Sequence, residues 1–424
     1  MKLDGLWEHA DFRRLWAGQT LSTLGANMVA VAVPLLAAVS LGASVFQMGL
    51  LLATEFLPYL LISLFVGVWL DRRPKKLIIV AADVARSLIL LSVPLLAWAG
   101  LLSVPLLLVV VFGTGACSTV SDIGSASILP ALVEREDLVE GNSKLELSSS
   151  VSNIGGRTVG GLLVQLLTGP VVILLDVFAF GLAAACTLRI RRREPVPERP
   201  TGGEPSSLWQ EIGEGLGFVF GNPTLRFLVP ATFLINFSAI AIDPLFLVFV
   251  TRTLDLPGIL VGALLAGTGA GSLVGALLAA RLGRLLPFGR MVVWVTVAMT
   301  AVELVIPAAT LMPAGIAFAM LMFVQIAYAV LVISSSVNIR SYQAAITPDT
   351  MQGRMNASTR MIVMAGTPFG AMAGGALGAL LGTRPAIVVC AGGIGLAALL
   401  LGLSPVRRAT GAPAEAPTPT PATI

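Results

Sequence analysis

Ten ionisable side chains lie within long apolar stretches of the sequence, and their chemistry needs an explanation. They are Glu55, Asp83, Arg86, Asp122, Arg157, Asp176, Asp243, Glu303, Arg340 and Arg360. Burying a charge in hydrocarbon costs about 2.5–3.5 kcal/mol on insertion scales, so such a group normally faces a cavity or a partner. The acids in this set are therefore candidates for carrying protons or holding a cation.

Three acids lie where a proton carrier or a substrate contact would be expected. Glu55 is followed by Pro58 and has no basic neighbour in the sequence, so it is the first candidate for proton carriage. Asp243, which precedes Pro244, and Glu303 are its counterparts in the second half of the chain. Either of these two could instead contact a cationic substrate or face a loop.

Asp122 and Arg157 are expected at similar depth in neighbouring antiparallel helices, at about 1.5 Å of rise per residue. An ion pair between them is therefore possible. If a conformational change separated the two, the carboxylate would take up a proton; the alternative is a permanent structural pair, and the sequence favours neither.

Asn27 and Asn236 could also line a cavity, although hydrogen bonds between helices are the commoner fate of such residues.

The composition requires a membrane around these residues. The chain has 424 residues, of which 56% are hydrophobic and 12% charged, and its mean hydropathy is +0.90. Repeated apolar stretches of about 20 residues suit a bilayer and not a soluble core. The net charge of +4 indicates no nucleic-acid partner, and three scattered cysteines with a single histidine, His9, predict no metal site and no cofactor.

Long apolar runs predict an all-α integral membrane protein, because a helix satisfies its backbone polar groups internally. Twelve spans are expected, near 15–40, 47–70, 76–99, 104–130, 143–168, 171–190, 224–250, 257–282, 289–311, 314–341, 355–382 and 385–404. The N-terminus has acids where a signal peptide needs bases, so the first span should be retained. Lys and Arg concentrate in alternate loops, which predicts that both termini are cytoplasmic.

An internal repeat divides the chain into two six-helix halves. Gly156, Gly160 and Gly161 recur as Gly370, Gly374 and Gly375, at an offset of 370 − 156 = 214. Gly49 recurs as Gly262, at 262 − 49 = 213. We expect an N-terminal half at 1–190, a cytoplasmic linker with an amphipathic helix at 191–222, a C-terminal half at 223–404 and a disordered tail at 405–424. Two parallel halves of this kind place a substrate site between them, near the bilayer midplane.

A short polar loop between the second and third spans carries the pattern Gly67-x-x-x-Asp71-Arg72-x-x-Lys75-Lys76. This loop resembles the corresponding loop of the major facilitator superfamily of transporters, although Pro74 stands where that family usually has glycine. Further similarity lies in Phe12-Arg13-Arg14-Leu15-Trp16, Ala82-Asp83-Val84-Ala85-Arg86 and Gly353-Arg354-Met355-Asn356-Ala357-Ser358. Within the family, the chain resembles the branch of enterobactin-type siderophore exporters and macrolide or multidrug efflux proteins.

The resemblance implies roles for two of these motifs. Asp71 would lie near the N-terminus of the eleventh span when the cytoplasmic side is closed, so that its loop acts as a gate. Independently of the resemblance, Asp83 and Arg86 are one helical turn apart, so a local ion pair that supports this loop is favoured over the alternative of a substrate role. The glycine motif resembles the antiporter signature of the fifth span, with Arg157 at the position of its usual proline.

These observations favour a proton-coupled exporter of an amphipathic small molecule in a bacterial inner membrane, acting as a monomer by alternating access. Its partners would be the small molecule, protons and the lipid bilayer. A non-transporting sensor or assembly protein on the same fold, or an importer, remain the alternatives. No phosphate-binding G-x-x-x-x-G-K-[ST] loop and no hydrolase constellation occurs, so we do not expect an enzyme.

Overall fold

The computed structural model describes residues 6–70, 75–133, 138–191, 208–348 and 351–409, and the elements found there are helices. The first six long helices are α1 (Ala10–Leu35), α2 (Val45–Leu70), α3 (Lys75–Trp98), α4 (Val104–Leu132), α5 (Leu138–Leu167) and α6 (Gly169–Leu188). After α7 (Leu208–Gly221) come α8 (Leu225–Val248), α9 (Gly258–Leu285), α10 (Phe288–Glu303), α11 (Ala314–Ile346), α12 (Gln352–Leu381) and α13 (Thr383–Leu403). The expectation of an all-α membrane fold is confirmed.

Each of the twelve expected spans corresponds to a long helix. Eleven helices are long and apolar enough to cross a membrane among the described residues; α5 falls outside this set because its sequence is rich in serine, glycine and charge. The span expected at 289–311 is divided, because α10 ends at Glu303 and a 3₁₀ helix, η5 (Ile306–Leu311), follows with Pro307 in its first turn. Proline lacks the N–H that would continue the α-helical ladder.

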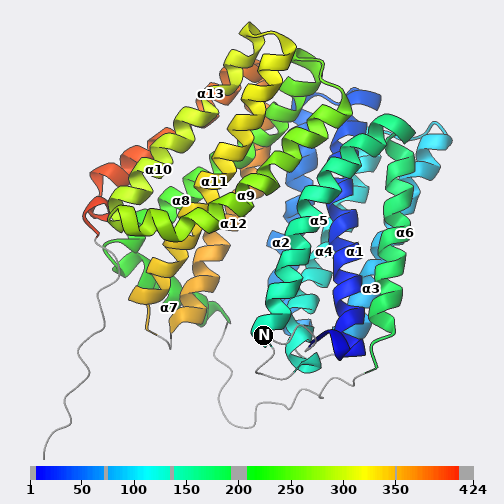
Figure 1. Ribbon diagram of the computed structural model, residues 1–424, viewed down its shortest axis with the longest axis horizontal. Helices are drawn as coiled ribbons and strands as arrows, with labels where there is room; N and C mark the ends of the chain where they lie inside the picture. The colour runs from blue at the N-terminus through cyan, green and yellow to red at the C-terminus, as the bar shows by residue number, and fades with distance from the viewer. Residues whose placement is uncertain (1–5, 71–74, 134–137, 192–207, 349–350, 410–424) are drawn as a thin grey trace, which may run out of the picture.

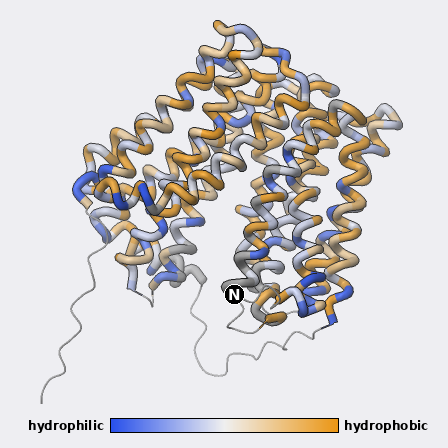
Figure 2. Tube along the Cα trace, in the orientation of Figure 1, coloured by the Kyte–Doolittle hydropathy of each residue, from blue (hydrophilic) through white to orange (hydrophobic). Residues whose placement is uncertain are grey.

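The long helices form two bundles (Figure 1). Helices α1–α6 pack against one another in one bundle, here called the N-terminal half, and α8–α13 form the other, the C-terminal half. The halves meet mainly along two helix pairs, α2 with α12 and α5 with α9, and α2 also contacts α8. Apolar residues run along the helices and polar ones gather at their ends (Figure 2), as a bilayer requires.

The linker region contains the expected amphipathic helix, α7, and the structure shows what α7 binds. It packs on α12, where Gly215 faces the Arg354 carbonyl oxygen and the Ser358 hydroxyl with no space for a Cβ atom. Beside this contact, Arg354 donates a hydrogen bond to the Glu214 carboxylate, and the two side chains form an ion pair. The linker residues 192–207 and the tail 410–424, for which disorder was expected, lie outside the described residues.

Two π-helical segments reveal the internal repeat in three dimensions. η2 (Leu36–Ser40) ends α1 and η4 (Phe249–Thr253) ends α8, at an offset of 249 − 36 = 213. Their closing hydrogen bonds match as well, because Leu41 N–H donates to the Leu36 carbonyl and Leu254 N–H donates to the Phe249 carbonyl. A rare helix type at equivalent positions shows that the repeat extends to backbone detail.

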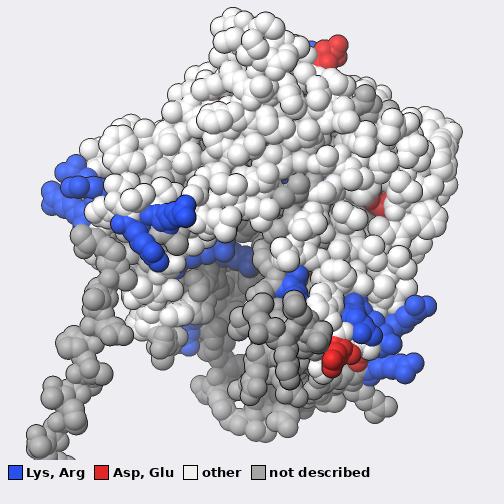
Figure 3. Space-filling view, viewed as in Figure 1, with Lys and Arg blue, Asp and Glu red and all other residues white. Residues whose placement is uncertain are grey.

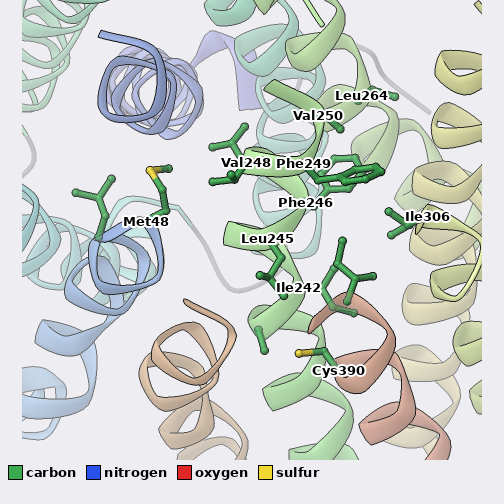
Figure 4. Close-up of a cluster of buried hydrophobic side chains, with 14 of the residues drawn as sticks. Met48, Ile242, Leu245, Phe246, Val248, Phe249, Val250, Leu264, Ile306 and Cys390 are labelled. Carbon is green, nitrogen blue, oxygen red and sulfur yellow. The ribbon is translucent and has the colours of Figure 1, made fainter. Parts of the chain in front are cut away.

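The apolar core is continuous from one half to the other around α8. Ile242, Leu245, Phe246 and Phe249 of α8 and η4 are buried (Figure 4). Cys390 of α13 and Ile306 of η5 pack in the same cluster, and buried Met48 of α2 faces it from the opposite half. Because α8 also forms one wall of the cavity described next, this packing fixes the position of the cavity residues.

Candidate functional site

A cavity of about 260 Å³ lies between the two halves. Its walls come from α1–α5 of the N-terminal half and from α8 and α9 of the C-terminal half, and most of its lining is apolar. Its apolar part includes Ala26, Val29, Ala30, Val33, Met48, Leu51, Phe56, Leu90, Val111, Ile240, Phe246, Leu247 and Leu265. Such a surface suits an apolar or amphipathic small molecule.

Four charged residues interrupt this apolar lining: Glu55, Arg86, Arg157 and Asp243. Glu55 of α2 and Asp243 of α8 are exposed to the cavity from opposite halves. Neither carboxylate forms a hydrogen bond or ion pair within the part of the chain that the structure describes. The structure thus brings together three of the residues that the sequence nominated, Glu55, Asp243 and Arg157.

Arg157 bridges the two halves. Its Nε donates to Asn27 Oδ1 of α1 at 3.4 Å, and its Nη1 donates to Thr268 Oγ1 of α9 at 3.4 Å. Asn27 is oriented by its own hydrogen bond to the Thr23 carbonyl. Both contacts of Arg157 are long and to neutral groups, so its positive charge stays available to the cavity, with Asp243 and Glu55 as the acids in electrostatic range.

The pair of Asp122 and Arg157 that the sequence allowed is not formed. Asp122 lines a second, polar pocket of about 290 Å³ inside the N-terminal half, and the basic residues in its electrostatic range are Arg86 and Arg360. Similar depth does not suffice for a pair, because Asp122 lines this polar pocket and Arg157 lines the central cavity.

The expected ion pair of Asp83 and Arg86 is not formed either. Asp83 is buried and accepts a hydrogen bond from Ser121 at 3.0 Å. The Arg86 guanidinium instead lies over the Phe180 ring, with its carbon 4.0 Å from the ring centre. A cation over an aromatic face is stabilised by the ring quadrupole. Arg86 also lines the central cavity, a placement closer to the alternative of a substrate role than to the favoured ion pair.

Two further nominated residues lie outside the cavity lining. Glu303 is buried inside the C-terminal half at the end of α10, and its Oε2 has no hydrogen-bond partner among the described residues. Asn236 of α8 donates to the Val363 carbonyl and to the Thr367 hydroxyl of α12, at 3.1 and 3.2 Å. Asn236 thus forms the helix-to-helix hydrogen bonds that are usual for a buried amide.

The predicted gating loop is described only at its edges. Asp71 and Arg72 lie outside the described residues, and Gly67 falls in the last turns of α2. Lys75 and Lys76 begin α3, and Lys76 Nζ donates to the Ile190 carbonyl at 2.6 Å. This contact joins the start of α3 to the end of α6.

The repeated glycines pack helices together, and they do so crosswise between the halves. A Cβ atom on Gly161 of α5 would lie 2.6 Å from the Gly262 Cα atom of α9, and one on Gly49 of α2 would lie 2.8 Å from the Gly375 Cα atom of α12. Gly156 and Gly160 pack on α1, and Gly370 and Gly374 pack in the same way on α8. Close approach of helix backbones at such positions is typical of membrane proteins.

One cross-half contact was missed by the sequence analysis. Arg252 of η4 donates through Nη2 to the Ala38 carbonyl at 2.9 Å and to the Ala43 carbonyl at 2.5 Å, both in the N-terminal half. The signal was present, because Arg252 and Arg384 are the two basic residues on the loops opposite the many Lys and Arg. Arg252 therefore ties the halves together at the end of the bundle remote from α7.

Among the described residues, twelve long helices in two related bundles surround a charged central cavity, which is a helical membrane transporter fold. The chain belongs to the Major Facilitator Superfamily, whose family model matches residues 15–342.

The chain is 26% identical over 236 residues to macrolide efflux protein A of Streptococcus pyogenes, covering 55% of this chain and 57% of that protein. It is also 26% identical over 274 residues to the MFS-type transporter YfiS of Bacillus subtilis, covering 63% of each. The matches thus span less than two thirds of the curated relatives.

Solved structures share the fold over nearly the whole chain. A bacterial homologue of the human lysosomal transporter Spinster, inward-facing and unoccupied, has a TM-score of 0.73 at 16% identity and covers 94% of this chain and 96% of its own. A bacterial homologue of the iron transporter ferroportin, also inward-facing, has a TM-score of 0.74 at 16% identity, with 92% and 97% covered. The nucleoside transporter NupG has a TM-score of 0.71 at 11% identity, with 92% and 98% covered.

Proposed function

We propose that the protein is a proton-coupled exporter of an amphipathic small molecule that works by alternating access. The observation that carries the proposal is the central cavity, whose apolar walls contain Glu55, Asp243 and Arg157 without a direct ion pair among the described residues. An apolar wall can hold the body of such a molecule, while fixed charges select its polar groups and exchange protons.

The two acids give a physical route to coupling. Glu55 belongs to the N-terminal half and Asp243 to the C-terminal half, so both enter a narrower space when the halves close around the cavity. Closing over an ionised carboxylate leaves a charge without water, which is costly, whereas a protonated carboxyl or a bound cationic substrate removes that cost. Proton and substrate would therefore bias the same equilibrium between two states.

Two features give the proposed orientation in the membrane, and a third gives the proposed direction of transport. Lys and Arg gather at the end of the bundle that carries α7 and the chain start (Figure 3), and the positive-inside rule assigns this end to the cytoplasm, with both termini there. The halves separate at the same end and are tied by Arg252 at the other. Similarity to macrolide efflux protein A favours export over import. We propose a bacterial inner membrane as the location and a monomer as the working unit.

The test measures accumulation of drugs and metabolites in an efflux-deficient bacterium that expresses the wild type, Glu55→Gln, Asp243→Asn or the control Asp255→Asn. Asp255 is an exposed loop acid with a φ of 51°, a conformation that asparagine also tolerates, so the control removes one charge outside the cavity. We expect cells that express the wild type or the control to accumulate less compound than cells with empty vector. An uncoupler should abolish this difference, and at least one of the two cavity variants should lose it.

The contrary results are equally specific. Higher accumulation with wild type, dependent on the proton gradient, would identify an importer. Equal activity of both cavity variants and wild type would remove the two acids from the coupling mechanism. No difference between wild type and empty vector across the compounds, with the protein confirmed in the membrane, would favour the non-transporting alternative.

A further inference from the structure

A third pocket, remote from the central cavity, lies at the α7-bearing end of the C-terminal half. Its volume is about 600 Å³, and it is lined by Pro287, Arg290, Arg407 and Arg408. The three arginines come from the first turn of α10 and from the 3₁₀ helix η7 (Pro405–Arg408) that follows α13. Each is exposed, and none of them forms an ion pair with a carboxylate among the described residues. We call this group of residues the arginine pocket.

The pocket is built by fixed backbone contacts and does not depend on flexible side chains alone. Gly289 N–H donates to the Ala409 carbonyl at 3.0 Å, which fastens η7 to the start of α10. A side chain at Gly289 would clash with the Val406 carbonyl oxygen, so only glycine permits this approach. Ser404 caps η7 by accepting from Val406 N–H at 3.2 Å, and the Val406 side chain is completely buried. Arg407 is thereby held next to the first turn of α10.

The positive potential of the arginine pocket favours the binding of an anion. Three guanidinium groups around one pocket repel one another, and the N-terminus of the 16-residue helix α10 adds positive potential at the same place. Guanidinium groups bind phosphate through paired hydrogen bonds. A phosphate group is therefore the ligand chemistry that fits the site best.

The surface beside the pocket identifies the source of the phosphate. Trp294 and Val297 follow Arg290 by four and seven residues, so they lie on the same face of α10, and Trp294 is 63% exposed. On the adjacent helix α13, Leu399 and Leu403 are 62% and 86% exposed. These side chains lead from the arginines into the hydrocarbon region, where acyl chains would cover them. Tryptophan is common at this boundary between headgroups and hydrocarbon.

We propose that the arginine pocket binds the headgroup of an anionic phospholipid, with the acyl chains lying against α10 and α13. Basic pockets at the ends of membrane helices on the cytoplasmic side fit such headgroups. The lipid phosphate would offset part of the positive charge of the arginines and hold η7 on α10, fixing the end of the C-terminal half at the membrane surface. This proposal does not depend on the transported substrate.

The test compares two double variants that remove the same charge. The full-length protein is purified in detergent, phosphatidylglycerol or phosphatidylcholine is added, and bound lipid is counted by native mass spectrometry. Arg407→Gln with Arg408→Gln alters the pocket; the matched control, Arg281→Gln with Arg284→Gln, alters exposed arginines at the end of α9 that do not line it. We expect about thirtyfold weaker phosphatidylglycerol binding in the pocket variant and near wild-type binding in the control.

Three results would overturn the proposal. Equal loss in both double variants would indicate attraction to general surface charge. Unchanged binding in the pocket variant would place the lipid elsewhere. Displacement of the lipid by inorganic phosphate at matched concentration would identify a site for a soluble anion.

Gly289→Ala keeps every charge and should still weaken lipid binding by displacing η7, whereas Gly315→Ala, which has open space around its Cβ position, should not.

Discussion

Removing the Arg252 side chain should open the end of the transporter remote from α7. Arg252 donates two hydrogen bonds across the halves, to the Ala38 and Ala43 carbonyls. Both acceptors lie in or just after the π-helical segment η2, where the change of helix type frees carbonyls from the regular ladder. The equivalent position in the N-terminal half, Val39, cannot make such bonds, so the tie depends on one side chain.

The size of the effect follows from the number and setting of the bonds. A hydrogen bond to a charged group contributes about 1.5–3 kcal/mol when buried, and these two are only partly buried. Taking about 1 kcal/mol each gives about 2 kcal/mol favouring the closed end, which corresponds to about a thirtyfold change in the equilibrium between closed and open. Arg252→Met retains most of the apolar stem and removes both bonds.

Cysteine labelling from outside the cell measures this equilibrium directly. In a background without Cys117, Cys186 and Cys390, Ala30→Cys places a thiol in the wall of the central cavity. A membrane-impermeant maleimide should label it up to about thirtyfold faster in Arg252→Met than in the parent. The control is Arg384→Met, because Arg384 lies at the same end but bonds to Thr310 within its own half. Equal labelling rates in all three proteins would refute the role assigned to Arg252.

Two further predictions concern glycines at helix contacts, each with a glycine of the same helix as its control. Gly161→Ala should lower the melting temperature and the transport rate, because its Cβ would lie 2.6 Å from the facing helix α9; overpacking costs about 1–3 kcal/mol. Gly155→Ala, with open space around it, should leave both unchanged. Gly215→Ala should release α7 from α12 and speed proteolysis of the linker, whereas Gly217→Ala should not; similar cleavage of both would contradict the packing role of Gly215.

The sequence predicted the helices well because length and hydropathy alone decide them. Every expected span corresponds to a helix, and a helix, α7, is present at Leu208–Gly221. The π-helical segments and the break after Glu303 were not predicted, because they depend on local competition among hydrogen bonds that hydropathy does not record. Helix boundaries moved by a few residues for the same reason.

The sequence predicted which residues line the cavity better than it predicted which side chains contact one another. Glu55, Asp243 and Arg157 were nominated by the cost of a charge in hydrocarbon, and they do line the cavity. The pair favoured for Asp83 and the pair considered possible for Asp122 are not formed, because depth along a helix says nothing about the direction of a side chain around it. Glu303 was nominated on the same basis as Asp243, and only the packing of α10 shows that it lies away from the cavity.

The two copies of the repeat share residues that pack helices together but differ in their charged cavity residues. Positions that pack the halves together are glycines in both copies, since Gly49 of α2 corresponds to Gly262 of α9. Charged cavity residues break the symmetry: Glu55 corresponds to Thr268, at 268 − 55 = 213, and Asp243 corresponds to Ala30. Both uncharged counterparts contact the site, since Thr268 bonds Arg157 and Ala30 lines the wall. The duplicated backbone thus creates the central cavity, and departures from the duplication supply the charges that a transported molecule would meet.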